Sequence, residues 1–258
     1  MSIDIADFAG RLNLPEYPRS SAYDADWLIE NMMGPNPLWL TEALTDCMPL
    51  QRDERVMDLG CGKALSSIFL AKEFGVHVEA VDLWIGAAEN RERIRDAHLS
   101  GQVDAVQADA VKLPFDDASF DAIASVDAYH YFGTSPEALP VVLRVLRQGG
   151  RVGIVVPGLV HEIDSWPEHL MPWWQDGFDT FHSPEWWRCH WEQGGQVKVE
   201  LADRVPHGHD HWRRWAQIAD DWAIAHGQEP YRDEVAMLQA DTDRLLGFTR
   251  VVATKPWT

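Results

Sequence analysis

The segment from residue 55 to residue 157 alternates short β-branched runs with longer stretches of helical spacing. This alternation predicts parallel strands joined by crossover helices, because parallel neighbours cannot be connected by a tight turn. The last helical stretch is bounded by a start signal at Ser135-Pro136 and a stop signal at Gly149-Gly150. We therefore predict an α/β fold with strands at 55–59, 76–82, 102–108, 120–127 and 151–157.

The rest of the chain is predicted to complete one domain that covers residues 1–258. The helical pattern before the first strand is broken at Gly34 and Pro35, and this break suggests a lid. Further strands are expected at 196–205 and 248–257. We divide the domain into an N-terminal helical lid (1–50), a core (51–157), a Trp-rich cap insertion (158–195) and C-terminal strands and helices (196–258).

The composition narrows the possible functions. The formal net charge of -19 repels polyanions and leaves no basic stripe for phosphates, so a nucleic-acid partner is not expected. The three cysteines are widely spaced and offer neither a disulfide framework nor a CxxC metal site. The apolar runs are too short for a membrane span of about 20 residues. The stretch MSIDIADFAG lacks a secretory signal, so we expect a cytoplasmic protein; nothing in the sequence specifies its oligomeric state.

One loop in the predicted core has the features of a ligand-binding turn. A strand ends at Asp58, the chain turns through Gly60 and Gly62, and a helical stretch follows at once. Glycine lets backbone approach a bound molecule where a Cβ atom would collide, and the N–H groups of a helix start can face that molecule. Asp82 follows Gly60 by 22 residues, the spacing at which an acid hydrogen-bonds a ribose diol. The pattern indicates a nucleotide-like ligand.

Two classes of nucleotide-like ligand compete for this loop. A nicotinamide or flavin dinucleotide favours a G-x-G-x-x-G loop, but the sequence GCGKAL (60–65) lacks the third glycine. Asp58 would repel a nearby pyrophosphate, whereas it suits a ligand that carries an amine or a sulfonium. These residues favour S-adenosylmethionine over a dinucleotide.

The stretch VMDLGCGKALSS (56–67) resembles the first motif of class I methyltransferases, D-x-G-x-G-x-G. The resemblance covers about residues 50–160 and continues in order through Asp82 and the stretches QADAVKLPF, FDAIASVDAYHYF and LRVLRQGGRVGIVVP. More narrowly, the layout is similar to the small-molecule methyltransferases grouped with cyclopropane-fatty-acid synthases and ubiquinone-type C-methyltransferases. It implies a seven-stranded, doubly wound, Rossmann-like sheet whose last strand is antiparallel. Ala64 departs from the family's third glycine and is expected to narrow the pocket.

The resemblance also implies a cofactor, S-adenosylmethionine, and the residues that bind it. Three residues of the first motif would hold the methionine portion: Asp58, Gly60 and Gly62. Asp82 would accept hydrogen bonds from the ribose hydroxyls. Four residues would surround the adenine: Leu83, Trp84, Asp109 and Ala110. The implied activity is transfer of a methyl group to a small-molecule acceptor.

Methyl transfer is an in-line displacement at an activated carbon, so the protein mainly has to align donor and acceptor. Candidate catalytic side chains follow the fourth predicted strand, where open α/β sheets bind ligands: Asp127, Tyr129 and His130. His130 is the preferred general base because an imidazole has an unperturbed pKa of about 6.5. The alternative is a structural, hydrogen-bonded histidine. Asp127 would orient His130 or contact the amino group of the cofactor. Cyclopropane synthases carry a Glu and a His in place of His130 and Tyr131, which argues against lipid cyclopropanation.

Ten of the thirteen tryptophans lie after residue 160. An insertion between the fifth and sixth strands commonly caps the substrate side in this family, so its aromatic side chains would form an apolar or cation-accepting wall. The alternative is a Trp-rich core beneath a long connection. The candidates for substrate contact are Tyr131, His161, Trp173, Trp174 and His182.

The stretch HGHDHW (207–212) suggests a competing metal site. On a strand, residues two apart share a face, so His207, His209 and His211 could bind one transition metal. We favour a solvated loop before a helix, and predict no metal. Two other functions compete with methyl transfer for the chain: a nicotinamide-dependent oxidoreductase, and a non-catalytic module that binds a cofactor or a metal.

Overall fold

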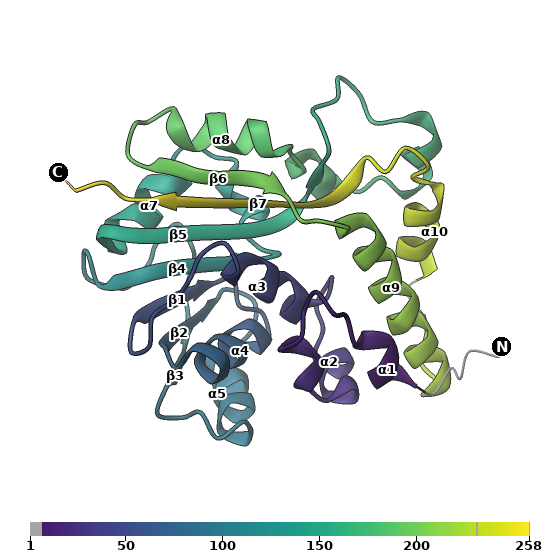
Figure 1. The fold of residues 1–258 in the computed structure, drawn as a ribbon, viewed down its shortest axis with the longest axis horizontal. Coiled ribbons are helices and arrows are strands. Elements are labelled where there is room, and N and C mark those ends of the chain that lie inside the picture. Colours follow the sequence, from purple (N-terminus) through teal and green to yellow (C-terminus); the bar gives the residue numbers. More distant parts are fainter. Residues whose placement is uncertain (1–6, 231, 258) are drawn as a thin grey trace.

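The computed structural model describes residues 7–230 and 232–257, which contain one seven-stranded sheet flanked by helices (Figure 1). Residues 1–6 of the predicted lid lie outside the described residues. The strand order is β3-β2-β1-β4-β5-β7-β6, and β7 runs antiparallel to both of its neighbours. The strands are β1 (Arg55–Leu59), β2 (His77–Asp82), β3 (Val103–Gln107), β4 (Phe120–Val126), β5 (Leu146–Leu159), β6 (Lys198–Arg204) and β7 (Leu246–Thr254). The predicted doubly wound fold is confirmed.

The chain changes its direction of travel across the sheet between β1 and β4. β1 pairs in parallel with β2 on one side and with β4 on the other. At such a switch point the loops that follow the two strands lead to opposite faces of the sheet and leave a crevice at the carboxyl ends of the strands. This topology places the glycine loop after β1 beside the loop after β4.

Helices cover both faces of the sheet. One face packs against α3 (Pro37–Thr45), α4 (Leu65–Phe74) and α5 (Ala87–Asp96), and the other against α7 (Ala138–Val145) and α8 (Pro184–Glu192). Successive residues of β1 enter different clusters, since Val56 packs with the first set of helices and Met57 with the second. Burial on both faces explains why the strands read as continuous apolar runs rather than as alternating ones.

Further helices lie beyond the carboxyl ends of the parallel strands (Figure 1). An ion pair of 2.6 Å between Arg11 and Asp221 joins the first helix to the long C-terminal helix, and the Trp222 indole N–H donates to the Asp26 carboxylate at 2.7 Å. The predicted break near Gly34 is present between the second and third helices. These helices are α1 (Phe8–Leu12), the 3₁₀ helix η1 (Ser20–Ala22), α2 (Ala25–Glu30), α9 (Gly208–Ala225) and α10 (Arg232–Ala240).

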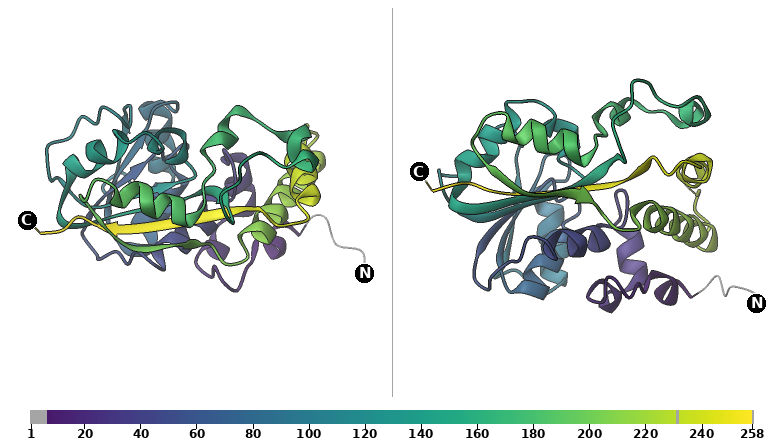
Figure 2. Two further views of the ribbon diagram at one scale, coloured as in Figure 1. Left: turned by 90° about the horizontal axis from the view of Figure 1, so that it is seen from above. Right: turned by 45° about the horizontal axis from the view of Figure 1, so that its top comes forward.

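The Trp-rich segment between β5 and α8 contains two 3₁₀ helices, η2 (Glu168–Trp173) and η3 (Asp176–Thr180). Figure 2 shows this segment extending outward beside α10 before it returns to α8. Trp187 and Trp191 of α8 are fully buried in the core, whereas Trp174 keeps 36% of its surface exposed. The tryptophans therefore serve both as core and as accessible wall.

One helix is shorter than predicted. The stretch expected to be helical up to Gly149-Gly150 leaves the helix after Val145, because Leu146 already pairs with Phe120 of β4. The register then shifts before Arg151. Strand pairing overrides the helical pattern here.

The histidine-rich stretch also differs from its prediction. His207 is the N-cap residue of α9, and His209 and His211 lie in the first turns of that helix, where both are buried. The His211 ring packs edge-on against Tyr17, with ring centroids 5.3 Å apart. The prediction of a solvated loop is therefore wrong, because tertiary packing extends helix α9 back to Gly208. Within the described residues, no helix is long and apolar enough to cross a membrane.

Candidate active site

Two glycines shape the loop after β1. Gly60 and Gly62 have φ angles of 78° and 53°, in the left-handed region that favours glycine. A Cβ atom on Gly60 would collide with the side chain of Ala128, and one on Gly62 would lie 2.9 Å from the sulfur of Met33. The Gly60 N–H donates to the carbonyl of Val81 at 2.8 Å. The loop is therefore held against β2 and in close contact with the loop after β4.

Asp82, the last residue of β2, joins two loops through its carboxylate. Its Oδ2 atom accepts a hydrogen bond from the Gly62 N–H at 2.8 Å, and its Oδ1 atom accepts from the N–H groups of Trp84 and Ile85, both at 2.8 Å. A carboxylate oxygen can accept two hydrogen bonds, so Oδ2 keeps capacity for a further donor. Asp82 both organises the site and offers an acceptor to a ligand.

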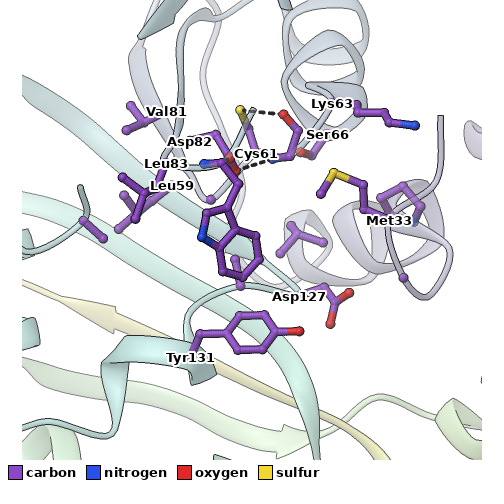
Figure 3. Close-up of a pocket in the computed structure, with 18 of the residues that line it drawn as sticks. Met33, Leu59, Cys61, Lys63, Ser66, Val81, Asp82, Leu83, Asp127 and Tyr131 are labelled. Carbon is purple, nitrogen blue, oxygen red and sulfur yellow. Dashed lines mark hydrogen bonds between the residues drawn. The ribbon is translucent and has the colours of Figure 1, made fainter. Parts of the chain in front are cut away.

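A cavity of about 280 Å³, here named the strand-end cavity, lies at the carboxyl ends of β1, β2 and β4 (Figure 3). The turn between α2 and α3 contributes Met33, Gly34 and Pro35 to the cavity wall. The sequence predicted a helix break here and suggested that the segment is a lid. The cavity wall includes most of the predicted cofactor residues, namely Gly60, Gly62, Asp82, Leu83, Trp84, Asp109 and Ala110.

The strand-end cavity has a negative electrostatic character. Three carboxylates line it, those of Asp82, Asp109 and Asp127. Among its described lining residues the only cationic side chain is that of Lys63, which extends away from the cavity in Figure 3 and donates to the Glu30 carbonyl at 3.2 Å. Such a cavity suits a ligand that carries positive charge and repels a pyrophosphate.

Asp58 is the predicted cofactor residue that does not reach this wall. Its side chain is fully buried, and its Oδ2 atom accepts hydrogen bonds from the Ser66 and Ser67 hydroxyls at 2.6 Å. Burial raises the pKa of Asp58 to about 6. Asp58 thus fixes the first turn of α4, and Ser66 lines the cavity in its place.

Ala64 is fully buried outside the cavity wall and has a φ angle of 63°, so the expected narrowing of the pocket by this residue is not found.

A larger cavity of about 830 Å³, here named the aromatic cavity, adjoins the first. Trp173 and Trp174 of the Trp-rich segment line it, as does Tyr131, so the structure brings together three of the five predicted substrate residues. The two cavities share Met33, Gly34, Pro35, Asp127 and Tyr131.

Asp127 stands where the two cavities meet. It follows β4 with a φ of 54°, and its N–H donates to the Val155 carbonyl at 2.8 Å. The carboxylate lies against the Cα atom of Gly34, where a side chain would collide with it. Burial and the negative charge of Glu234 raise the pKa of Asp127 well above its usual range. A left-handed backbone at a non-glycine residue is a local strain that often marks a functional position.

His130, the first residue of the short helix α6 (His130–Gly133), lines only the aromatic cavity. Its side chain is 1% exposed, and its Nδ1 atom has no hydrogen-bond partner among the described residues. Burial lowers the pKa of His130 to about 4. The ring lies 4.0 Å from that of Tyr131, between centroids. The imidazole is therefore uncharged at neutral pH and holds a proton weakly.

Three other predicted residues lie away from both cavities. Tyr129 is fully buried in the core, where its ring contacts those of Phe132, Trp187 and Trp191. His161 is exposed outside the cavities. The Nδ1 atom of His182 lies 3.0 Å from the Glu162 carboxylate, and its ring stacks on Trp186. The structure does not bring Tyr129 together with Asp127 and His130.

Glu234 of α10 is an acid in the aromatic cavity that sequence reasoning missed. It is half-buried, and its carboxylate accepts a hydrogen bond from the Trp212 indole N–H. Burial raises the pKa of Glu234. No motif surrounds it in the sequence, and its only signal is an acid on an otherwise apolar helix face.

The histidines of α9 form no metal centre with their neighbours. The His209 Nε2 atom lies 3.5 Å from the Asp241 carboxylate, whereas His207 is exposed at the helix start. On a helix these three residues do not share one face as they would on a strand. Over residues 7–230 and 232–257, no three His, Cys, Asp or Glu side chains are grouped so that they could hold a metal ion.

The sheet has the strand order of the class I methyltransferase fold. The glycine loop after β1 and the acid at the end of β2 belong to the same fold. Residues 56–150 match a family model described as a methyltransferase domain. The chain therefore contains a methyltransferase domain, and the resemblance found in the sequence is confirmed.

Similar proteins include methyltransferases of small molecules. The demethylmenaquinone methyltransferase of Clavibacter sepedonicus is 35% identical over 156 residues, which cover 60% of this chain and 61% of the relative. The 27-O-demethylrifamycin SV methyltransferase of Amycolatopsis mediterranei (strain S699) is 31% identical over 116 residues, or 45% and 43% of the two chains. The chain thus spans about half the length of the curated relatives it matches.

Solved structures share the fold at low identity. The geranyl diphosphate C-methyltransferase from Streptomyces coelicolor A3(2), solved with Mg²⁺, geranyl diphosphate and S-adenosyl-L-homocysteine, has a TM-score of 0.66 at 18% identity, over 83% of this chain and 78% of that one. The [4+2]-cyclase SpnF has a TM-score of 0.67 at 18% identity, over 85% and 82%. Since SpnF is named a cyclase, the fold by itself does not determine the reaction.

Proposed function

We propose that this chain binds S-adenosylmethionine in the strand-end cavity and transfers its methyl group to a small molecule in the aromatic cavity. The observation that carries the proposal is the junction at Asp127 and Tyr131, where the strand-end cavity meets the larger aromatic cavity. A donor and an acceptor held in the two cavities would meet at this junction. The methyltransferase domain at residues 56–150 and the small-molecule relatives support the same activity.

The residues of the strand-end cavity fit the proposed cofactor. The open acceptor capacity of Asp82 suits a ribose diol, and Asp109 suits the amino group of the adenine beside Leu83 and Trp84. The negative wall favours a ligand with an amine and a sulfonium over a dinucleotide. Gly60 and Gly62 leave room for the methionine portion.

When bound, S-adenosylmethionine supplies a methyl group already activated on a sulfonium. The protein then has to bring the acceptor into line with that methyl group and to exclude water. Met33 and Pro35 of the N-terminal segment line the junction, as does Tyr131 of α6. Asp127 is better placed than His130 to take a proton there, because Asp127 lines both cavities.

The test is an incubation of the protein with methyl-labelled S-adenosylmethionine and small-molecule extracts, followed by mass spectrometry. We expect label in a small molecule and tight binding of S-adenosylhomocysteine by calorimetry. Binding of the cofactor with all label retained on it would argue for non-transfer chemistry. Binding of a nicotinamide dinucleotide in its place would support the oxidoreductase alternative.

A further inference from the structure

Two carboxylates enter the aromatic cavity from different elements. Asp127 follows β4 and Glu234 belongs to α10, and both line this one cavity; burial and, to a lesser extent, the negative charge of Glu234 raise the pKa of Asp127. Neither carboxylate forms an ion pair with a Lys or Arg side chain among the described residues. Two like charges in a space of low dielectric repel each other, and a positive ligand between them would relieve this repulsion.

The wall around these acids suits a cation as well. Tyr131, Trp173 and Trp174 present aromatic surface to the same cavity, and aromatic faces attract ammonium groups. Arg232 is a cationic side chain in the wall, and it is exposed beside the equally exposed acids Glu229 and Asp233. The cavity thus keeps an excess of negative charge.

His130 provides an independent sign of a ligand in this cavity. Its side chain is 1% exposed and lines the cavity, and its Nδ1 atom has no partner among the described residues. A buried polar atom without a partner is costly, so a ligand that hydrogen-bonds it would be favoured. Because the imidazole is uncharged, it does not neutralise the nearby acids.

We propose that the methyl acceptor is an amine, whose ammonium group binds between Asp127 and Glu234 against the aromatic wall and is methylated on nitrogen. This inference rests on the proposed methyl transfer and specifies its substrate class.

The proposed step balances in protons and electrons. The Asp127 carboxylate takes one proton from the ammonium group, and this frees the nitrogen lone pair. That pair forms the new C–N bond while the C–S bond breaks, and its electrons remain on sulfur. The products are a protonated N-methylamine and S-adenosylhomocysteine. Asp127 returns its proton to water as the products leave.

The test compares two probes of one shape, phenethylamine and phenethyl alcohol, titrated by tryptophan fluorescence in saturating S-adenosylhomocysteine. We expect the amine to bind about tenfold more tightly or better, because a charge-assisted hydrogen bond is stronger than a neutral one. Asp127→Asn and Glu234→Gln should each remove most of this preference. Glu92→Gln, which removes the same charge from the exposed surface of α5, should leave it intact.

Equal affinity for the two probes, or an amine that fails to bind, would overturn the inference. So would a preference that survives in both Asp127→Asn and Glu234→Gln. Binding of S-adenosylhomocysteine, measured first, separates this result from the proposed function. If S-adenosylhomocysteine does not bind, the proposed function fails; if it binds without an amine preference, only the substrate class fails.

Discussion

Asp82 gives the sharpest prediction for a single residue. Its carboxylate accepts three backbone hydrogen bonds and lines the strand-end cavity. One further hydrogen bond, from the proposed ribose to this charged carboxylate, would contribute about 1.5–3 kcal/mol to binding. Asp82→Ala should therefore weaken S-adenosylhomocysteine binding about ten- to a hundredfold in calorimetry. An unchanged affinity in a folded variant would remove Asp82 from the cofactor site.

Asp58 gives a prediction about stability rather than binding. Burial raises its pKa from 3.8 to about 6, so the folded protein holds a proton that the unfolded chain releases between these pH values. Asp58 therefore stabilises the fold below about pH 4, and this contribution, at most about 3 kcal/mol, is lost as the pH rises through 6.

The test of Asp58 is urea unfolding of wild type and Asp58→Asn from pH 4 to pH 7. The free energy of unfolding of the variant, relative to wild type, should increase across this range by up to about 3 kcal/mol. Asp104→Asn, on the exposed surface of β3, is the control and should show no such change. A flat difference for Asp58→Asn would contradict the buried carboxylate.

At this scale the sequence predicted cavity residues that stand near a motif or in the Trp-rich segment, and it missed Glu234, which has neither signal. Asp82 and Gly62 were found because their spacing follows backbone geometry, and both line the cavity. Asp58 belongs to the same motif, but the Ser66 and Ser67 hydroxyls that bind its side chain come from the first turn of α4. Glu234 could not be found, because only the packing of α10 brings it toward Asp127.

Among the elements, strands were predicted more reliably than the ends of helices. Double-sided burial produces the apolar runs of β1 and β4, and this signal is present in the sequence itself. The end of α7 depends on the pairing of Leu146 with Phe120, which are distant in the chain. The start of α9 depends on burial of His211 against Tyr17, which is more distant still. Local pattern could not decide either boundary.

The loop between β1 and α4 can be tested against a glycine elsewhere. Gly60 and Gly195 both have positive φ, 78° and 63°, but a Cβ atom on Gly195 would meet nothing within 4 Å. Ala at either position should cost about 1–2 kcal/mol for the left-handed backbone. Gly60→Ala should cost more in urea unfolding and should also weaken S-adenosylhomocysteine binding, because its Cβ atom would collide with Ala128. Equal losses in the two variants would contradict this close approach.

Considered as a whole, the molecule builds its two cavities in different ways. The strand-end cavity is formed mainly by loops after β1, β2 and β4, and a contiguous motif predicts most of it. The aromatic cavity joins the N-terminal segment, the Trp-rich segment and α10, which lie far apart in the sequence. Most of the lining of the strand-end cavity could therefore be predicted from sequence, whereas the aromatic cavity was predicted only in part, through Tyr131, Trp173 and Trp174.

This arrangement predicts that cofactor binding stabilises the entire domain, because the turn at Met33 and the loops after three strands contact one cavity. S-adenosylhomocysteine at about a hundred times its dissociation constant should add about 2.7 kcal/mol to the free energy of unfolding. For a domain of this size, that corresponds to a rise of roughly 5–10 °C in Tm. Differential scanning calorimetry would measure it, and in Asp82→Ala at the same ligand concentration a ten- to hundredfold weaker affinity should reduce the added free energy to about 0.4–1.4 kcal/mol. NADH should give no rise, since the carboxylates of the strand-end cavity repel its pyrophosphate. A rise with NADH and none with S-adenosylhomocysteine would replace the methyltransferase proposal with the oxidoreductase alternative.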